Sequence, residues 1–185
     1  VILQDIEINK IIPNTIRINI KEKQAALGWL TNQQEYLVDQ QGMIIKRFYT
    51  INTPRIYQLS EQVSLPLTNL SDDLLKINNL ENSQVNLGDQ VLKEQDVTFI
   101  NDLTDELAGV DYFKLKSLEV PGNFPKYVTV TDQADWQINF NTAEPIKSQI
   151  KRLNVLVADE IKKENLSRLD YIDLRLGESV YYKYK

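Results

Sequence analysis

The amino-acid sequence predicts an α+β fold that is mostly antiparallel β-sheet with two main helices. Several segments alternate apolar and polar residues with a period of two, which is typical of strands in antiparallel sheets. Two other segments space their apolar residues three and four apart, which is typical of amphipathic helices. Turn residues separate these segments, so they mark where one expected element ends and the next begins.

The N-terminal part predicts two hairpins. In residues 4–22, isoleucines alternate with polar residues on both sides of a turn at Pro13, so we expect two half-buried antiparallel strands. Residues 35–39 and 43–48 flank a turn at Gly42 and predict the second hairpin.

Residues 52–86 show no clear period. Pro54 and Pro66 interrupt the pattern, and Ser71 predicts the cap of a short helical turn. The polar stretch 80–88 predicts a loop.

Two apolar stripes predict the helices. The first stripe lies in 91–107 and ends at Gly109, a residue that often follows a helix. The second runs over 146–161, with Pro145 expected in its first turn and Thr142 as its N-cap. The stripe residues are Val91, Leu92, Phe99, Ile100, Leu103 and Leu107, then Ile146, Ile150, Leu153, Val157 and Ile161.

Five further strands complete the pattern, three between the helices and two after the second helix. They are expected at 112–120, 126–131, 135–140, 170–176 and 179–184. The predicted order is therefore two hairpins, a helix, three strands, a helix and a final hairpin, as in α+β proteins.

Composition excludes several classes of function. The 185 residues include no His and no Cys, which excludes catalysis through these side chains, zinc sites with His or Cys ligands, and disulfides. The formal net charge of −5 disfavours a general binder of nucleic acids or anionic membranes. The six glycines form neither a dinucleotide-binding nor a Walker sequence, so we expect no cofactor.

Carboxylate pairs are the remaining catalytic option, although capping, turn formation and solvation explain them better. No EF-hand sequence accompanies them, so we expect neither a metal site nor a catalytic residue. The pairs are Asp72/Asp73, Asp102/Asp105, Asp132/Asp135 and Asp170/Asp173.

The last predicted strand is rich in tyrosine. Val180, Tyr182 and Tyr184 share one face, and Tyr181 and Lys183 share the other. One interpretation is an edge strand whose lysines prevent aggregation. The other is a docking edge, where unpaired backbone groups accept a partner's strand and aromatic side chains anchor it.

Six segments follow one another in an order found in a known family. They are Ile12-Pro13-Asn14-Thr15-Ile16-Arg17-Ile18-Asn19-Ile20-Lys21-Glu22, Ala26 with Trp29, Tyr36-Leu37-Val38-Asp39 with Gly42, Leu65-Pro66-Leu67, Tyr171-Ile172-Asp173-Leu174-Arg175, and Val180-Tyr181-Tyr182-Lys183. Together they resemble the FtsQ/DivIB family of bacterial cell-division proteins over nearly the whole chain.

This resemblance implies a non-enzymatic scaffold of the divisome that binds FtsB/DivIC and FtsL and helps to regulate septal peptidoglycan synthesis. Family members are single-pass proteins of the cytoplasmic membrane, with a POTRA domain and a β domain outside it. Residues 1–24 resemble the last two POTRA strands, a POTRA-like β-hairpin, and 25–185 resemble the β domain. Because the chain begins at Val1, we expect a processed form or a piece of a longer protein. The resemblance implies that the parent is membrane-anchored, with this segment on the extracytoplasmic side at the division septum.

The family also implies a partner site. FtsB-type partners add a strand and a helix to the last β-domain strand, and Lys126 is the basic residue nearest to a family position that pairs with a partner carboxylate. In some members the position after the matching Arg is a Tyr, whereas this chain has Leu176 there. The matching positions are Arg175, Leu176, Gly177, Ser179, Val180, Tyr181 and Tyr182.

The alternative function is a cell-wall carbohydrate-binding module or a carboxylate-dependent hydrolase. Trp29 and Trp136 could stack on sugar rings, although buried core positions are the better interpretation of both. An open sheet edge would favour the scaffold, whereas two convergent carboxylates in a cleft would favour the enzyme.

Overall fold

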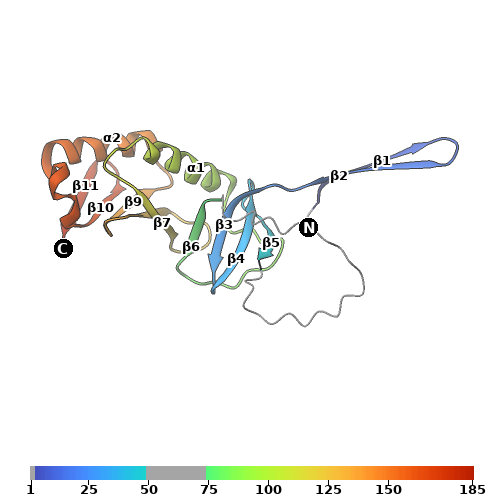
Figure 1. The fold of residues 1–185 in the computed structure, drawn as a ribbon, viewed down its shortest axis with the longest axis horizontal. Coiled ribbons are helices and arrows are strands. Elements are labelled where there is room, and N and C mark those ends of the chain that lie inside the picture. Colours follow the sequence, from blue (N-terminus) through green and yellow to red (C-terminus); the bar gives the residue numbers. More distant parts are fainter. Residues whose placement is uncertain (1–2, 49–73) are drawn as a thin grey trace.

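The computed structural model describes residues 3–48 and 74–185 and confirms an α+β fold. One sheet has nine strands in the order β11-β10-β9-β8-β7-β6-β3-β4-β5, and β1 and β2 form a separate two-stranded ribbon. Figure 1 shows this ribbon projecting away from the C-terminal end of the molecule. The strands are β1 (Leu3–Ile11), β2 (Thr15–Glu22), β3 (Ala25–Thr31), β4 (Gln34–Asp39), β5 (Ile44–Phe48), β6 (Lys76–Asn79), β7 (Leu115–Val120), β8 (Tyr127–Asp132), β9 (Gln137–Asn141), β10 (Leu169–Leu176) and β11 (Ser179–Tyr184).

The ribbon confirms the first predicted hairpin but not its expected half-burial. Ile6 lies opposite Ile20 and Ile8 lies opposite Ile18, so these isoleucines gather with Ile16 on one face. Their side chains are between 49% and 67% exposed. The expectation is wrong because alternation creates an apolar face without specifying what covers it, and no described residue does so.

The sheet is mostly antiparallel, as predicted, but β6 pairs in parallel with β3 and β7, and β9 pairs in parallel with β10. All predicted strands form, with ends shifted by a few residues. The sequence pattern did not predict β3 and β6. β3 is apolar without a clear alternation, and β6 has only four residues.

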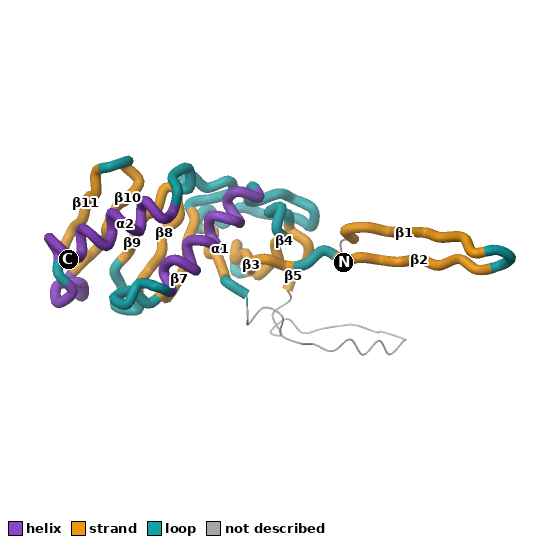
Figure 2. Tube along the Cα trace, turned by 90° about the horizontal axis from the view of Figure 1, so that it is seen from above, coloured by secondary structure: helices purple, strands orange, loops and turns teal. Residues whose placement is uncertain are grey.

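Two helices cover one face of the sheet, as Figures 1 and 2 show from two directions. They are α1 (Glu94–Ala108) and α2 (Ile146–Leu156), and both predicted stripes face the core. The largest fully buried side chains include Trp29, Trp136, Phe140, Leu103 and Leu153. A π-helical turn (Val157–Ile161) and a 3₁₀-helix (Lys163–Arg168) then lead to β10.

The helix ends confirm one prediction and correct two. The C-terminal end of α1 lies at Gly109, as predicted. At α2, Pro145 occupies the N-cap position instead of the first turn. The hydroxyl of Thr142 donates a hydrogen bond to the carbonyl oxygen of Pro125 at 3.0 Å, so the expectation that it caps α2 is wrong.

The middle of the chain lies partly outside the description. The predicted loop at 80–88 is confirmed, because it contains no helix or strand. Pro54, Pro66, the predicted cap at Ser71 and the pair Asp72/Asp73 lie outside the described residues.

Candidate partner-binding edge

Strand β11 forms one edge of the nine-stranded sheet. It pairs antiparallel with β10, and within residues 3–48 and 74–185 no strand pairs with its other side. Five of its six residues are exposed, and Val180 is half-buried. In an edge strand the N–H and C=O groups of alternate residues point outward without a ladder partner. The outer side of β11 can therefore accept a strand.

The two faces of β11 differ in their contacts. Val180 packs against the core, and the rings of Tyr182 and Tyr184 meet edge to face with their centres 5.7 Å apart. Partial desolvation, followed by the nearby Glu160 carboxylate, raises the pKa of the Tyr182 hydroxyl. On the other face Tyr181 is 56% exposed and lies opposite Asp173. This face offers an uncovered aromatic ring beside the open edge.

β10 carries a bulge where it meets β11. Asp173 pairs with Tyr181 and Leu176 pairs with Ser179, so two β10 residues lie opposite Val180 alone. A bulge of this kind bends the strand and can redirect a side chain. The two bulged residues are Leu174 and Arg175.

The bulge presents Arg175 in a fixed position. Its Nε and Nη2 donate to the two carboxylate oxygens of Asp173, at 2.8 and 2.6 Å, and its backbone N–H donates to the same carboxylate at 3.0 Å. The guanidinium lies 4.5 Å from the centre of the Tyr127 ring, within cation–π range. Hydrogen bonding from Arg175 lowers the pKa of Asp173, and the same bond raises the pKa of Arg175.

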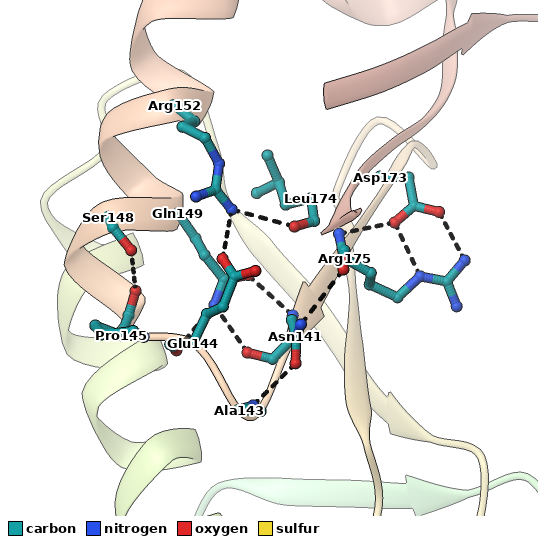
Figure 3. Close-up of polar contacts among 10 residues, drawn as sticks. All are labelled: Asn141, Ala143, Glu144, Pro145, Ser148, Gln149, Arg152, Asp173, Leu174 and Arg175. Atoms are coloured by element: carbon teal, nitrogen blue, oxygen red, sulfur yellow. Dashed lines mark hydrogen bonds and ion pairs between the residues drawn. The ribbon is translucent and has the colours of Figure 1, made fainter. Parts of the chain in front are cut away.

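Side chains from α2 and β9 hold the carbonyl groups of the bulge (Figure 3). Arg152 Nη2 donates to the carbonyl oxygen of Leu174 at 3.2 Å and to the carboxylate of Glu144 at 2.8 Å. Asn141 Nδ2 donates to the carbonyl oxygen of Arg175 at 3.3 Å. These contacts tie the bulge to the helical layer and to the neighbouring strand.

The fully buried side chain of Gln149 joins α2 to the end of β9. Its amide oxygen accepts from the backbone N–H of Asn141 at 2.9 Å, and its amide nitrogen donates to the carbonyl oxygens of Asn141 and Glu144. Sequence reasoning missed this residue. The signal was present, because Gln149 interrupts the apolar stripe between Ile146 and Leu153.

A cleft of about 700 Å³ opens beside the C-terminal end of β10. Lys126 and Arg175, both predicted site residues, line it together with Lys93. Its one acidic lining residue, Asp96, accepts a hydrogen bond from the backbone N–H of Lys93 at 2.9 Å. Exposed Phe124 and Leu176 add apolar surface, so the cleft suits an acidic segment with apolar side chains.

The seven predicted positions from Arg175 to Tyr182 all belong to the β10–β11 hairpin. Arg175 and Leu176 end β10, Gly177 lies in the turn, and Ser179, Val180, Tyr181 and Tyr182 are in β11.

A second groove, of about 560 Å³, lies on the helical side of β11. Its apolar lining comes from Val155, Leu156 and Val180, and Lys151 and Glu160 are among its charged residues. A strand added to β11 would point alternate side chains toward this groove and toward Tyr181.

Two of the four carboxylate pairs, Asp132/Asp135 and Asp170/Asp173, have structural partners. Asp132 is buried and accepts backbone N–H bonds from Lys114 at 2.6 Å and Ala134 at 2.7 Å, whereas Asp135 forms an ion pair with Lys116. Asp170 pairs with Lys183 at 3.0 Å and Asp173 with Arg175, while Asp102 and Asp105 are exposed on α1. In the described part of the chain no three acidic residues cluster as metal ligands.

Neither tryptophan is available to stack on a sugar. Trp29 and Trp136 are fully buried in the core, and the rings of Trp136 and Phe113 meet edge to face at 5.5 Å. The interpretation of both tryptophans as core residues is confirmed.

Comparison with known proteins leaves the family of this chain open. No protein-family model matches it, and no curated protein matches its sequence significantly. Among the described helices, none combines the length and apolar character needed to cross a membrane. The function is therefore argued from the edge, its two grooves and the residues that present them.

Proposed function

We propose that this chain is the extracytoplasmic part of an FtsQ/DivIB-type division protein, a non-enzymatic scaffold that binds an FtsB/DivIC-type partner by β-strand addition. The observation that carries the proposal is the open outer edge of β11, at the end of a nine-stranded sheet. In the proposed complex, the partner's strand pairs with β11 and extends the sheet. FtsL-type proteins then join through the same assembly, which helps to regulate septal peptidoglycan synthesis.

Backbone and side chains would contribute differently to this binding. The outward N–H and C=O groups of β11 supply hydrogen bonds to any strand and give no selectivity. Selectivity comes from the cleft, where Lys126 and Arg175 would meet a partner carboxylate, and from the ring of Tyr181. Arg175 is already held in place by its ion pair with Asp173. A partner carboxylate that binds Arg175 would therefore not have to immobilise a flexible side chain.

The ribbon supports the domain division within this proposal. A two-stranded hairpin is marginally stable alone, and the isoleucine face of β1 and β2 is exposed. We assign residues 1–24 to the end of a POTRA-like domain whose other elements would cover that face. In a single-pass parent of the cytoplasmic membrane, these elements would lie between the anchor and the β domain at the septum.

Replacing Tyr181 by alanine tests the proposed site. The side chain is 56% exposed, so we expect little change in thermal stability. The affinity for the extracytoplasmic segment of the same organism's FtsB/DivIC-type protein, measured by calorimetry, should fall about tenfold, because an exposed aromatic anchor is lost.

Leu80→Ala is the matched control, because Leu80 is also 56% exposed but directly follows β6, which four strands separate from β11. We expect it to bind the segment like the wild-type chain. Equal affinities for Tyr181→Ala and Leu80→Ala would remove Tyr181 from the site, and no binding by the wild-type chain would reject the proposed partner.

A further inference from the structure

We infer that Arg152 of α2 is a positioning residue for the partner-binding edge, because it holds the β10 bulge in the form that presents Arg175 to the cleft. The effect on binding rests on the proposed function. The effect on the bulge does not, and it can be measured in the free protein.

The bulge depends on side chains for three of its backbone groups. Arg152 donates to the carbonyl oxygen of Leu174, Asn141 donates to the carbonyl oxygen of Arg175, and Asp173 accepts from the N–H of Arg175. A bulge interrupts the regular ladder, so such groups need other partners when they are buried. Here α2, β9 and β10 each supply one partner, and Arg152 is the contribution from the helical layer (Figure 3).

Arg152 is itself held by few contacts. Its Nη2 bridges the carboxylate of Glu144 and the carbonyl oxygen of Leu174, at 2.8 and 3.2 Å. Its Nε is buried without an acceptor among the residues that the structure describes. The Nη2 bridge is therefore what orients the guanidinium, and a charged donor makes a stronger hydrogen bond than a neutral one. Removing the Arg152 guanidinium would take this hydrogen-bond donor from the carbonyl oxygen of Leu174. Leu174 is fully buried, and a buried carbonyl group that loses its donor destabilises the local structure.

The bulge matters because it sets the register of the docking strand. Asp173 pairs with Tyr181 on one side of it and Leu176 pairs with Ser179 on the other. Without the extra residue, one of these pairings would have to slip by one position. A one-residue slip turns side chains to the opposite face of a sheet, so Arg175 would no longer keep its place over Tyr127. Arg152 thus acts on the edge through Arg175. Because Arg152 also lines the groove on the helical side of β11, its effect on the bulge is read from the free protein.

The test compares Arg152→Met with the wild-type chain in two measurements. In the free protein, we expect the NMR amide signals of Arg175 and Tyr181 to shift, because the bulge loses the Arg152 bond. The affinity for the FtsB/DivIC-type segment should fall about tenfold, a size of effect found when a residue coupled to a binding site is changed. Arg152→Lys retains the charge and a donor and should recover part of the loss.

Lys147→Met is the matched control, since it removes a positive charge from an 85% exposed side chain on the same helix. It should change neither measurement. If Arg152→Met does not fold, Glu144→Gln replaces it, because this change removes the ion pair that holds Arg152 and should act in the same direction.

Unchanged amide signals at Arg175 in the folded variant would overturn the inference. Shifted signals with wild-type affinity would overturn its consequence for binding. If the wild-type chain does not bind the segment, the proposed function fails, and the amide signals of the free protein still decide the role of Arg152 in the bulge.

Discussion

Proline at position 180 or 181 is expected to lower the affinity for an FtsB/DivIC-type segment by at least about a hundredfold, equivalent to about 2.7 kcal/mol. Proline lacks the N–H donor, and its ring occupies the space where a neighbouring strand must approach. Val180 and Tyr181 are the second and third of the six residues of β11, so the change would interrupt the pairing of the added strand.

The two proline variants separate docking from folding. Consecutive N–H groups of a strand point to opposite sides, so one of these two donors points outward and the other points toward β10. We expect the outward variant to lose binding and keep its thermal midpoint, and the inward variant to lose both. Circular dichroism and calorimetry check this pair of results. A folded variant of either kind with wild-type affinity would contradict the docking edge.

Gly42→Ala is expected to destabilise the β domain by about 3 kcal/mol or more, lowering its thermal midpoint by about 10 °C. Gly42 has a φ of +78°, where a side chain is unfavourable, and an added Cβ would lie 2.0 Å from the carbonyl oxygen of Leu92. That oxygen is backbone and cannot rotate away. The carbonyl oxygen of Gly42 also accepts bonds from the N–H groups of Val91 and Leu92, at 2.9 and 3.3 Å. The turn and the segment before α1 are therefore locked together.

Gly88→Ala isolates the cost of the backbone conformation. Gly88 has a φ of +88°, but an added Cβ would meet no atom within 4 Å. We expect a loss of about 1–2 kcal/mol there, from the left-handed conformation alone. Thermal unfolding of the two variants would contradict this explanation if they were equally stable, because the contact with Leu92 would then have no energetic effect.

The hairpins could be predicted because their causes are local. A turn residue between two alternating segments specifies both strands and their antiparallel pairing, as at Pro13 and Gly42. Parallel pairing has no such local signal, since β6 joins β3 and β7, which are distant in sequence. Alternation also gave the apolar face of the ribbon, yet burial depends on what lies opposite that face, which no local pattern contains.

The docking hairpin could be located from the sequence, but the bulge in β10 and the side chains that hold it could not. The tyrosine-rich strand, the turn at Gly177 and the preceding Arg175 are visible in the sequence and lie together as expected. The β10 bulge depends on Arg152 and Asn141, which come from α2 and β9. Their contacts follow from how the helix crosses the sheet, and sequence spacing does not encode that geometry.

Hydrogen exchange of individual backbone amides, measured by NMR, tests the central claim most directly. The chain is compared with and without the extracytoplasmic segment of the FtsB/DivIC-type protein from the same organism. Strand addition predicts that alternate amides of β11 become protected, because only outward N–H groups gain partners. Binding of the segment with protection elsewhere and unchanged exchange throughout β11 would contradict the account.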